Sequence, residues 1–226
     1  MWIWKLQLTD SMKNMQKHNQ MKRLHLSKED IEAKKDSEDL SEGSLISVHG
    51  DHIYFYAPVN QESALILNQK LHQVSMQSLG GIFNSMYEVN PPPPIWLHIN
   101  SYGGEVFAAF AIADTIERIK TTVPIVTVVE GCAASAATII STAGTRRLMR
   151  KNSYMLIHEL SDMAWGRQSE LEDHIQSNKD IMKTMKDWYA QRTKIKPAEL
   201  EEILKRDRWW NSKQCKTKYG LVDDII

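Results

Sequence analysis

The sequence is poor in cysteine and has no long apolar segment. Its two cysteines, Cys132 and Cys215, fit no metal-ligand spacing, and a disulfide between them cannot be inferred from sequence. The N-terminal residues Met1-Trp2-Ile3-Trp4-Lys5 turn polar at once, unlike a signal peptide, and no later run reaches the length of a membrane span. We therefore expect a soluble, intracellular protein in the reducing cytoplasm.

An excess of charge of either sign is also missing. Lysine and arginine together number 28, as do aspartate and glutamate, so the formal net charge is +0. No global field draws such a chain towards nucleic acid or an anionic membrane, and we expect neither as a partner. The length of 226 residues allows one domain with a substantial core, plus a tail.

Residues 1–43 differ in composition from the rest of the chain. Basic side chains come first, from Lys5 to Lys28, and acidic ones follow, from Glu29 to Glu42. A segment this polar forms a solvated helix, a removable leader or a disordered tail, and it cannot form a core. We expect residues 1–43 to be a polar N-terminal tail or a propeptide, and residues 44–226 to be the folded domain.

From Ser44 onwards, short β-rich runs alternate with helical ones. This alternation predicts an α/β domain with a largely parallel, buried sheet. The expected strands cover residues 52–56, 95–99, 125–129, 147–149 and 154–158. The expected helices cover residues 61–87, 105–120, 134–142, 168–193 and 197–205.

The helix expected over residues 168–193 carries a narrow stripe of mostly apolar side chains. These recur every three or four residues and comprise Leu171, Ile175, Asn178, Met182 and Met185. A stripe this narrow is typical of packing or of subunit contact rather than of a cofactor site. We favour a subunit contact, with packing inside the chain as the alternative.

One serine stands among very small residues in the run Gly131-Cys132-Ala133-Ala134-Ser135-Ala136-Ala137. The run follows an apolar strand and precedes a helix, so Ser135 is expected at a strand-to-helix corner. Its hydroxyl is then exposed, and backbone N–H groups lie nearby to hold an oxyanion. The same run also fits a tight helix start with an ordinary serine, so the other residues must decide.

A serine nucleophile needs a base, and the base needs an orienting acid. His158 closes an expected strand, which makes it the best placed of the eight histidines; His98 lies inside a strand, where a packing role fits better. Asp207 precedes Trp209 and Trp210, which we expect to shield its carboxylate from water. Alone, His158 also fits a structural role and Asp207 a surface ion pair.

Candidate oxyanion donors follow another buried strand. In Ile99-Asn100-Ser101-Tyr102-Gly103-Gly104, paired glycines lie at a crossover turn, where backbone can approach a ligand without an intervening Cβ. The N–H groups of Gly103 and Ala136 could converge on one oxygen. The glycines could equally serve only the turn. No P-loop is present, because the third glycine and the Lys-Ser/Thr pair are missing.

Taken together, these motifs resemble the proteolytic subunit of the Clp protease family, ClpP, among the serine peptidases. The resemblance covers residues 44 to 226. It rests on residues 55–59, Ile99 to Gly104, Gly131 to Ala136, Met155 to Glu159, Arg206-Asp207 and Tyr219 to Asp223, which occur in this order.

The resemblance implies a role for each candidate. Ser135 would be the nucleophile, His158 the general base and then acid, and Asp207 the orienting carboxylate. The N–H groups of Gly103 and Ala136 would form the oxyanion hole. The fold would be the ClpP/crotonase-like repeated β-β-α superhelix with a protruding helical handle, which residues 168–193 would form. No metal or organic cofactor is implied.

The resemblance also implies partners. Members of this family stack as two rings of seven, a tetradecamer, around a closed chamber, and a hexameric Clp-type AAA+ ATPase unfolds and threads their protein substrates. The handle joins the two rings. ATP would be consumed by the ATPase, so the proteolysis is ATP-dependent although the chain itself needs no nucleotide.

The sequence departs from the family pattern at several positions. Tyr102 stands where proline is usual, and Glu159-Leu160 replaces glutamine and proline. The axial loops that touch the ATPase have no clear counterpart in residues 1–50. These differences leave peptide preference open. The hairpin between Ser135 and His158 is slightly short for the family, and the stretch from Asp207 to Tyr219 is about one residue long, which makes Asp207 the least secure of the three assignments.

Three alternatives remain at this point. The first is a specialised processing peptidase of the same fold, for example in viral maturation. The second is a crotonase-type acyl-CoA enzyme, which would leave the ordered Ser135, His158 and Asp207 set unexplained. The third is a ring subunit without catalysis.

Overall fold

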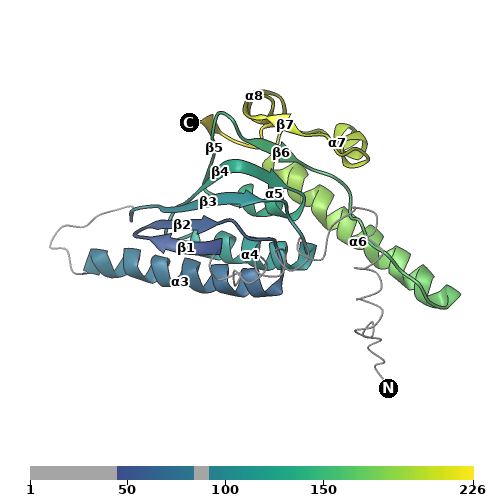
Figure 1. Cartoon of the computed structure of the whole chain (residues 1–226), viewed down its shortest axis with the longest axis horizontal. Coiled ribbons are helices and arrows are strands. Elements are labelled where there is room, and N and C mark those ends of the chain that lie inside the picture. Colours follow the sequence, from purple (N-terminus) through teal and green to yellow (C-terminus); the bar gives the residue numbers. More distant parts are fainter. Residues whose placement is uncertain (1–44, 84–91) are drawn as a thin grey trace, which may run out of the picture. The chain divides into compact units, whose positions relative to one another are not determined.

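The computed structural model of the chain describes residues 45–83 and 92–226. Figure 1 shows the elements along the chain. They are β1 (Ile46–His49), β2 (His52–Phe55), α3 (Gln61–Phe83), β3 (Ile95–Ser101), α4 (Val106–Ile119), β4 (Ile125–Ala134), α5 (Ala136–Ser141), β5 (Arg146–Met149), β6 (Tyr154–Leu156), α6 (Gln168–Arg192), α7 (Pro197–Leu204), β7 (Trp210–Asn211), α8 (Ser212–Gln214), the π-helix η2 (Cys215–Tyr219) and β8 (Asp224–Ile225).

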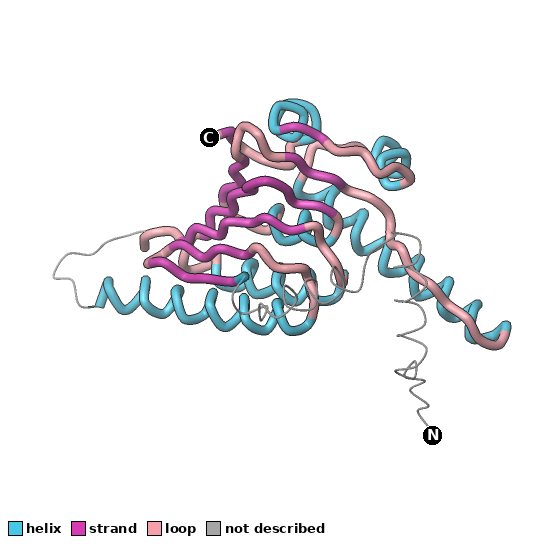
Figure 2. Tube along the Cα trace, in the orientation of Figure 1, coloured by secondary structure: helices cyan, strands magenta, loops and turns pink. Residues whose placement is uncertain are grey.

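One largely parallel sheet organises the described residues (Figure 2). Its strand order is β1-β2-β3-β4-β5-β8, and β6 pairs with both β4 and β7. Only β1 with β2 and β6 with β7 run antiparallel among the described strands. The predicted α/β class with a mostly parallel sheet is therefore confirmed, and the arrangement fits the ClpP/crotonase-like fold.

The two faces of the sheet carry different side chains because successive residues of a strand point to opposite sides. In β3, Ile95, Leu97 and Ile99 are fully buried in the main core, which also contains the apolar faces of α3, α4 and α5. Alternate residues face the other way, where a separate small cluster is formed by Trp96 of β3, Val126 and Val128 of β4 and Leu148 of β5.

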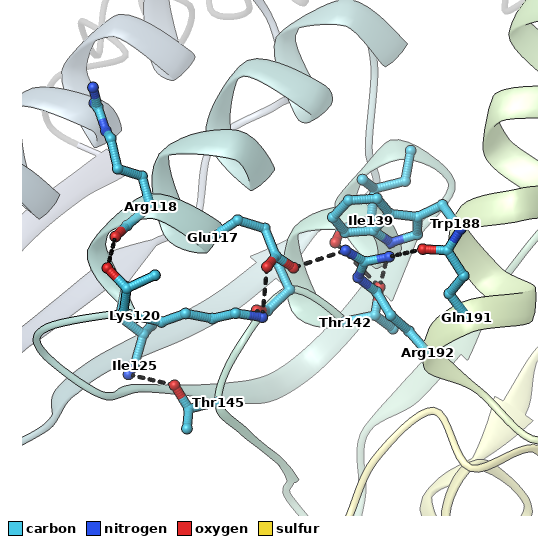
Figure 3. Close-up of polar contacts among 12 residues, drawn as sticks. Glu117, Arg118, Lys120, Ile125, Ile139, Thr142, Thr145, Trp188, Gln191 and Arg192 are labelled. Carbon is cyan, nitrogen blue, oxygen red and sulfur yellow. Dashed lines mark hydrogen bonds and ion pairs between the residues drawn. The ribbon is translucent and has the colours of Figure 1, made fainter.

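Helix α6 is anchored to this core mainly near its C-terminal end. Of its 25 residues only Met185 and Tyr189 are buried, and its first half extends away from the sheet (Figure 1). Figure 3 shows how the last turns are held: the indole N–H of Trp188 donates to Thr142 Oγ1 at 2.9 Å, and Arg192 pairs with Glu117 at 2.8 Å. The guanidinium of Arg192 also lies 3.5 Å from the centre of the Trp188 ring. The expected handle is present, while its contact with another subunit stays a prediction.

Several predicted boundaries are wrong, mostly where strands pair over long sequence separations. Strand β4 runs on to Ala134, since Cys132–Ala134 pair with β6, and α5 therefore begins at Ala136 rather than at residue 134. Strand β6 ends at Leu156, two residues before His158. Strand β1 was not predicted.

Two expectations fall on residues that the structure does not describe. The tail or propeptide predicted for residues 1–43 lies wholly outside the described residues, and so do the last residues of the helix predicted to reach residue 87. Within the described ranges, none of the helices has the length and apolar character needed to cross a membrane.

Candidate active site

Ser135 lies at a strained corner between β4 and α5. Its backbone has φ 52° and ψ −126°, and it is the one residue other than glycine with a positive φ in the described part of the chain. Such a conformation costs on the order of 1–3 kcal/mol and persists only where surrounding structure enforces it. Here the Ser135 N–H donates to the Leu156 carbonyl at 2.8 Å, which fixes the corner against the end of β6. The predicted strand-to-helix corner is confirmed.

The first turn of α5 is supported from behind by α6. The hydroxyl of Thr138 lies 2.6 Å from the Ser135 carbonyl oxygen, to which it donates, and 2.7 Å from the Tyr189 hydroxyl. Tyr189 is fully buried, and burial raises its pKa to about 12. The phenol therefore stays neutral, and its hydrogen bond to Thr138 helps to fix the backbone at Ser135.

His158 and Asp207 meet although they lie far apart in the sequence. His158 Nδ1 is 3.0 Å from Asp207 Oδ1. An ionised carboxylate can only accept, so Nδ1 carries the proton and Nε2 is left as the acceptor that a general base needs. A backbone hydrogen bond joins the two segments that carry this pair: the N–H of Glu159 donates to the Leu204 carbonyl at 2.8 Å, which ties the segment after His158 to the end of α7.

Ser135 and His158 line one cavity of about 270 Å³. The other residues around it are of mixed character and include Val106, Leu160 and Met185 as well as Tyr102, Glu159 and Ser161. No hydrogen bond joins Ser135 to His158 within the described residues. Such bonds are often long or absent without substrate and form only in the complex.

The expected shielding of Asp207 is wrong for the single chain. Its side chain is 77% exposed, because Trp210 turns away into the core, where it is 2% exposed, and Trp209 leans towards Tyr102 instead. A carboxylate in water gains little from an ion pair. The contact of Asp207 with His158 therefore adds little to the stability of the fold.

Gly103 lies directly against the serine corner. A Cβ built on Gly103, which has φ +91°, would come within 2.5 Å of the Ala134 carbonyl oxygen and 3.0 Å of the Ala136 nitrogen. Ala136 is the first residue of α5, where backbone N–H groups have no partner in the helix. The N–H of Gly103 donates to Ser101 Oγ at 3.2 Å, a long bond that an oxyanion would have to replace.

The loop that carries Gly103 is pinned to the segment after β2. The N–H of Val59 donates to the Gly103 carbonyl at 2.9 Å, and the Glu105 N–H donates to the Val59 carbonyl at 2.7 Å. A Cβ on Gly104 would come within 2.1 Å of the Val59 oxygen, so glycine is required there. The paired glycines therefore allow two close backbone approaches, one to Val59 and one to Ser135.

The thiols are poor candidates for the nucleophile. Both cysteines are free, and burial raises the pKa of Cys215 to about 12 and that of Cys132 above its ordinary value of 9.0. A protonated thiol is a weak nucleophile. In the described part of the chain, no group of three or more His, Cys, Asp or Glu side chains is arranged to hold a metal ion.

A polar cluster on the other face of the sheet was not foreseen. His98 is 4% exposed and lies between two partners: its Nε2 is 2.8 Å from His52 Nδ1, and its Nδ1 is 3.0 Å from Glu130 Oε1. Glu130 also accepts from the Tyr56 hydroxyl at 2.7 Å and from Arg150 Nε at 3.0 Å. The packing role expected for His98 is confirmed, but single-strand patterns could not reveal partners from three other segments.

Comparison with known proteins gives a consistent result. The chain is 34% identical over 139 residues to "ATP-dependent Clp protease proteolytic subunit 1" of Streptomyces coelicolor and 35% identical over 139 residues to "ATP-dependent Clp protease proteolytic subunit 3" of Streptomyces avermitilis. Each alignment covers 61% of this chain and 62% of the relative. The chain thus spans less than two thirds of the length of these relatives.

A sequence model of a whole family covers more of the chain. The model described as Clp protease matches residues 49–226, which contain all the candidate residues of the active site and nearly all of the described fold. Together with the relatives and the fold, this match shows that the chain belongs to the Clp protease family.

Proposed function

We propose that this protein is a serine endopeptidase of the ClpP type that uses Ser135, His158 and Asp207 as a catalytic triad. The observation that carries the proposal is the 3.0 Å contact between His158 Nδ1 and Asp207, beside a cavity that Ser135 and His158 share. The three residues come from separate segments of the chain, and the family resemblance implies a role for each, which supports the proposal.

The geometry supports the following order of events. His158 Nε2 takes the proton of Ser135 Oγ as the hydroxyl attacks the peptide carbonyl, and Asp207 stabilises the imidazolium that forms. The N–H groups of Ala136 and Gly103 hold the oxyanion, Gly103 exchanging its bond to Ser101 for a bond to substrate. His158 then gives its proton to the leaving amine. In the second half of the reaction, water attacks the acyl group while His158 takes its proton, and His158 returns a proton to Ser135 Oγ as the acid product leaves.

The cavity also suggests which substrates fit. It is small and has both apolar lining residues (Val106, Ala136, Leu160 and Met185) and polar ones (Glu159 and Ser161), so it suits one side chain of an extended peptide rather than a folded surface. This size supports unfolded proteins or peptides as substrates.

The remaining parts of the proposal rest on membership of the family. They are assembly into stacked heptameric rings, a tetradecamer, through α6; delivery of substrate by a Clp-type AAA+ unfoldase; a cytoplasmic location; and residues 1–43 as a tail or propeptide before a peptidase domain of residues 44–226. The two relatives are each named as proteolytic subunits of an ATP-dependent protease, which supports the pairing with an ATPase. A particle of fourteen chains would have fourteen times the mass of 26.0 kDa.

A crotonase-type acyl-CoA enzyme explains less. Such chemistry uses an oxyanion hole but gives no reason for the His158–Asp207 contact or for a strained serine beside it. Tight binding of a CoA thioester by the purified protein would revive this alternative.

The proposal is tested with a fluorophosphonate probe and a fluorogenic peptide. The probe should label Ser135 in the assembled protein, and labelling should vanish in Ser135→Ala and His158→Ala. Loss of serine or histidine should lower kcat by about 10⁶-fold. Ser161→Ala is the matched control, since Ser161 lines the same cavity, and it should keep its labelling. An assembled wild-type protein that neither labels nor cleaves peptides would contradict the proposal.

A further inference from the structure

Two exposed aromatic rings meet beside the candidate active site. Tyr102 is 79% exposed and lines the catalytic cavity, and Trp209 is 39% exposed. Their centroids lie 6.2 Å apart with the ring planes at 84°. This is the edge-to-face arrangement that aromatic pairs prefer. The two rings therefore adopt a favourable edge-to-face contact although neither ring is buried.

The pair joins two loops that carry different parts of the chemistry. Tyr102 directly precedes Gly103 in the loop between β3 and α4, which we call the oxyanion loop (residues 102–105). Trp209 follows Asp207 by two residues in the loop between α7 and β7, which we call the acid loop (residues 205–209). The rings thus link the orienting carboxylate to an oxyanion donor.

The backbone hydrogen bonds inside the acid loop are local: the N–H of Arg206 donates to the Ile203 carbonyl and that of Arg208 to the Arg206 carbonyl, both at 3.0 Å. They do not hold the loop against the rest of the site, so a further contact is needed. Residues 205–209 are all exposed. The loop is fixed at its start by the bond from the Glu159 N–H to the Leu204 carbonyl and at its end by the buried Trp210. Between these anchors the described residues provide two side-chain contacts across the site, one from Asp207 to His158 and one from Trp209 to Tyr102.

We propose that Tyr102 and Trp209 form an aromatic clasp that holds the acid loop against the oxyanion loop. Both are positioning residues: the clasp keeps Asp207 on His158 Nδ1 while Gly103 stays beside Ala136. The inference rests on the proposed peptidase function and adds two residues to it. Because misplacement by about 1 Å can cost 10²-fold in rate, a weak contact at this point affects turnover.

The clasp is tested by a double-mutant cycle on peptide cleavage. Trp209→Ala and Tyr102→Ala should each lower kcat by about 3- to 10-fold, the range expected for loss of an aromatic pair. The kcat of the double variant should be no lower than that of the less active single variant. For Trp209→Ala, KM for a short peptide should stay within about twofold, since Trp209 does not line the cavity.

Conservative variants and a neighbouring ring provide the controls. Tyr102→Phe and Trp209→Phe keep a ring on each side and should have a kcat close to that of the wild type. They keep the test valid even if one of the alanine variants is unstable. Phe107→Ala removes a ring that is 68% exposed nearby but outside the pair, and kcat should not change. In an Asp207→Asn background, Trp209→Ala should cost nothing further, because the residue that the clasp positions no longer works.

Three results would overturn the clasp. The first is additive losses in the double variant, and the second is phenylalanine variants as impaired as the alanine ones. The third is a rise in KM for Tyr102→Ala with no effect of Trp209→Ala, which would make Tyr102 a substrate contact. A wild-type protein that does not react with fluorophosphonate would instead remove the proposed function itself, so the two failures can be told apart.

Discussion

Gly103→Ala tests the oxyanion loop most directly. The new Cβ would lie 2.5 Å from the Ala134 carbonyl oxygen, whereas ordinary contacts begin near 3.4 Å. The neighbouring atoms on the Ala134–Ala136 side are mostly backbone at a strained corner, so the loop has to retreat by about 0.9 Å. A retreat of this size takes the Gly103 N–H out of hydrogen-bonding distance of the oxyanion.

The expected cost separates into activity and stability. Loss of one oxyanion donor lowers kcat by about 10²–10³-fold, or roughly 2.7–4 kcal/mol. The positive φ adds about 1–2 kcal/mol of destabilisation for a residue that carries a Cβ. Peptide cleavage by the assembled protein gives kcat, and urea unfolding gives the change in stability.

Gly50→Ala is the matched control. Gly50 has φ +63°, but a Cβ there would meet nothing within 4 Å. It should therefore lose stability by about 1–2 kcal/mol and keep its kcat. If Gly103→Ala stays folded and keeps its kcat within about threefold of wild type, the assignment of this loop as an oxyanion donor is refuted.

Three further predictions concern single side chains. Asp207→Asn should lower kcat by about 10⁴-fold, because an amide can favour the wrong His158 tautomer, and an unchanged rate in a peptide assay would contradict this role. Ser135→Gly should abolish labelling yet raise stability by about 1 kcal/mol, as glycine relieves φ 52°; a lower melting temperature would count against strain. Burial lowers the pKa of His98 below 6.5, although Glu130 opposes the shift, so the unfolded chain binds more protons and stability falls as pH drops below 6.5. Urea midpoints from pH 7 to 5 should show this slope in wild type and a smaller slope in His98→Gln.

The corner at Ser135 and the close approach at the glycine pair could be predicted from the sequence, whereas the extent of the strands around them could not. The small residues around Ser135 and the glycine pair after β3 are local signals, because close backbone approach leaves only small residues possible. The pairing of Cys132–Ala134 with β6, which places Ser135 next to Leu156, joins segments about twenty residues apart. Patterns of period two or 3.6 contain no information on such pairings, and β4 was therefore predicted too short.

The exposure of Asp207 shows a second kind of limit. Two tryptophans in a row suggested a shield, yet only Trp210 belongs to the short strand β7, and Trp209 lies in the loop before it. Trp210 therefore fills the core beside Tyr219, with ring centroids 4.3 Å apart, while Trp209 remains outside and contacts Tyr102. The sequence indicated that aromatic rings lie near the carboxylate, but the pairing of Trp210 with Met155 of β6, which takes this ring into the core, joins distant segments and could not be predicted from it.

The polar cluster on the face of the sheet opposite the main core links the strands that lead into the active-site loops. His52, His98 and Glu130 come from β2, β3 and β4, and the two hydrogen bonds between them join three adjacent strands side by side. Glu130 directly precedes Gly131, and His98 lies two residues before Asn100. The side-chain amide oxygen of Asn100 accepts a hydrogen bond from the Cys132 N–H at 3.2 Å. Hydrogen bonds from Tyr56, His98 and Arg150 outweigh burial and hold the pKa of Glu130 below 4.5, so the carboxylate is ionised at neutral pH. A slip of one residue between β3 and β4 would break these bonds and move Gly103 away from Ser135. The cluster is therefore expected to set the alignment on which both the proposed nucleophile and its proposed oxyanion donor depend.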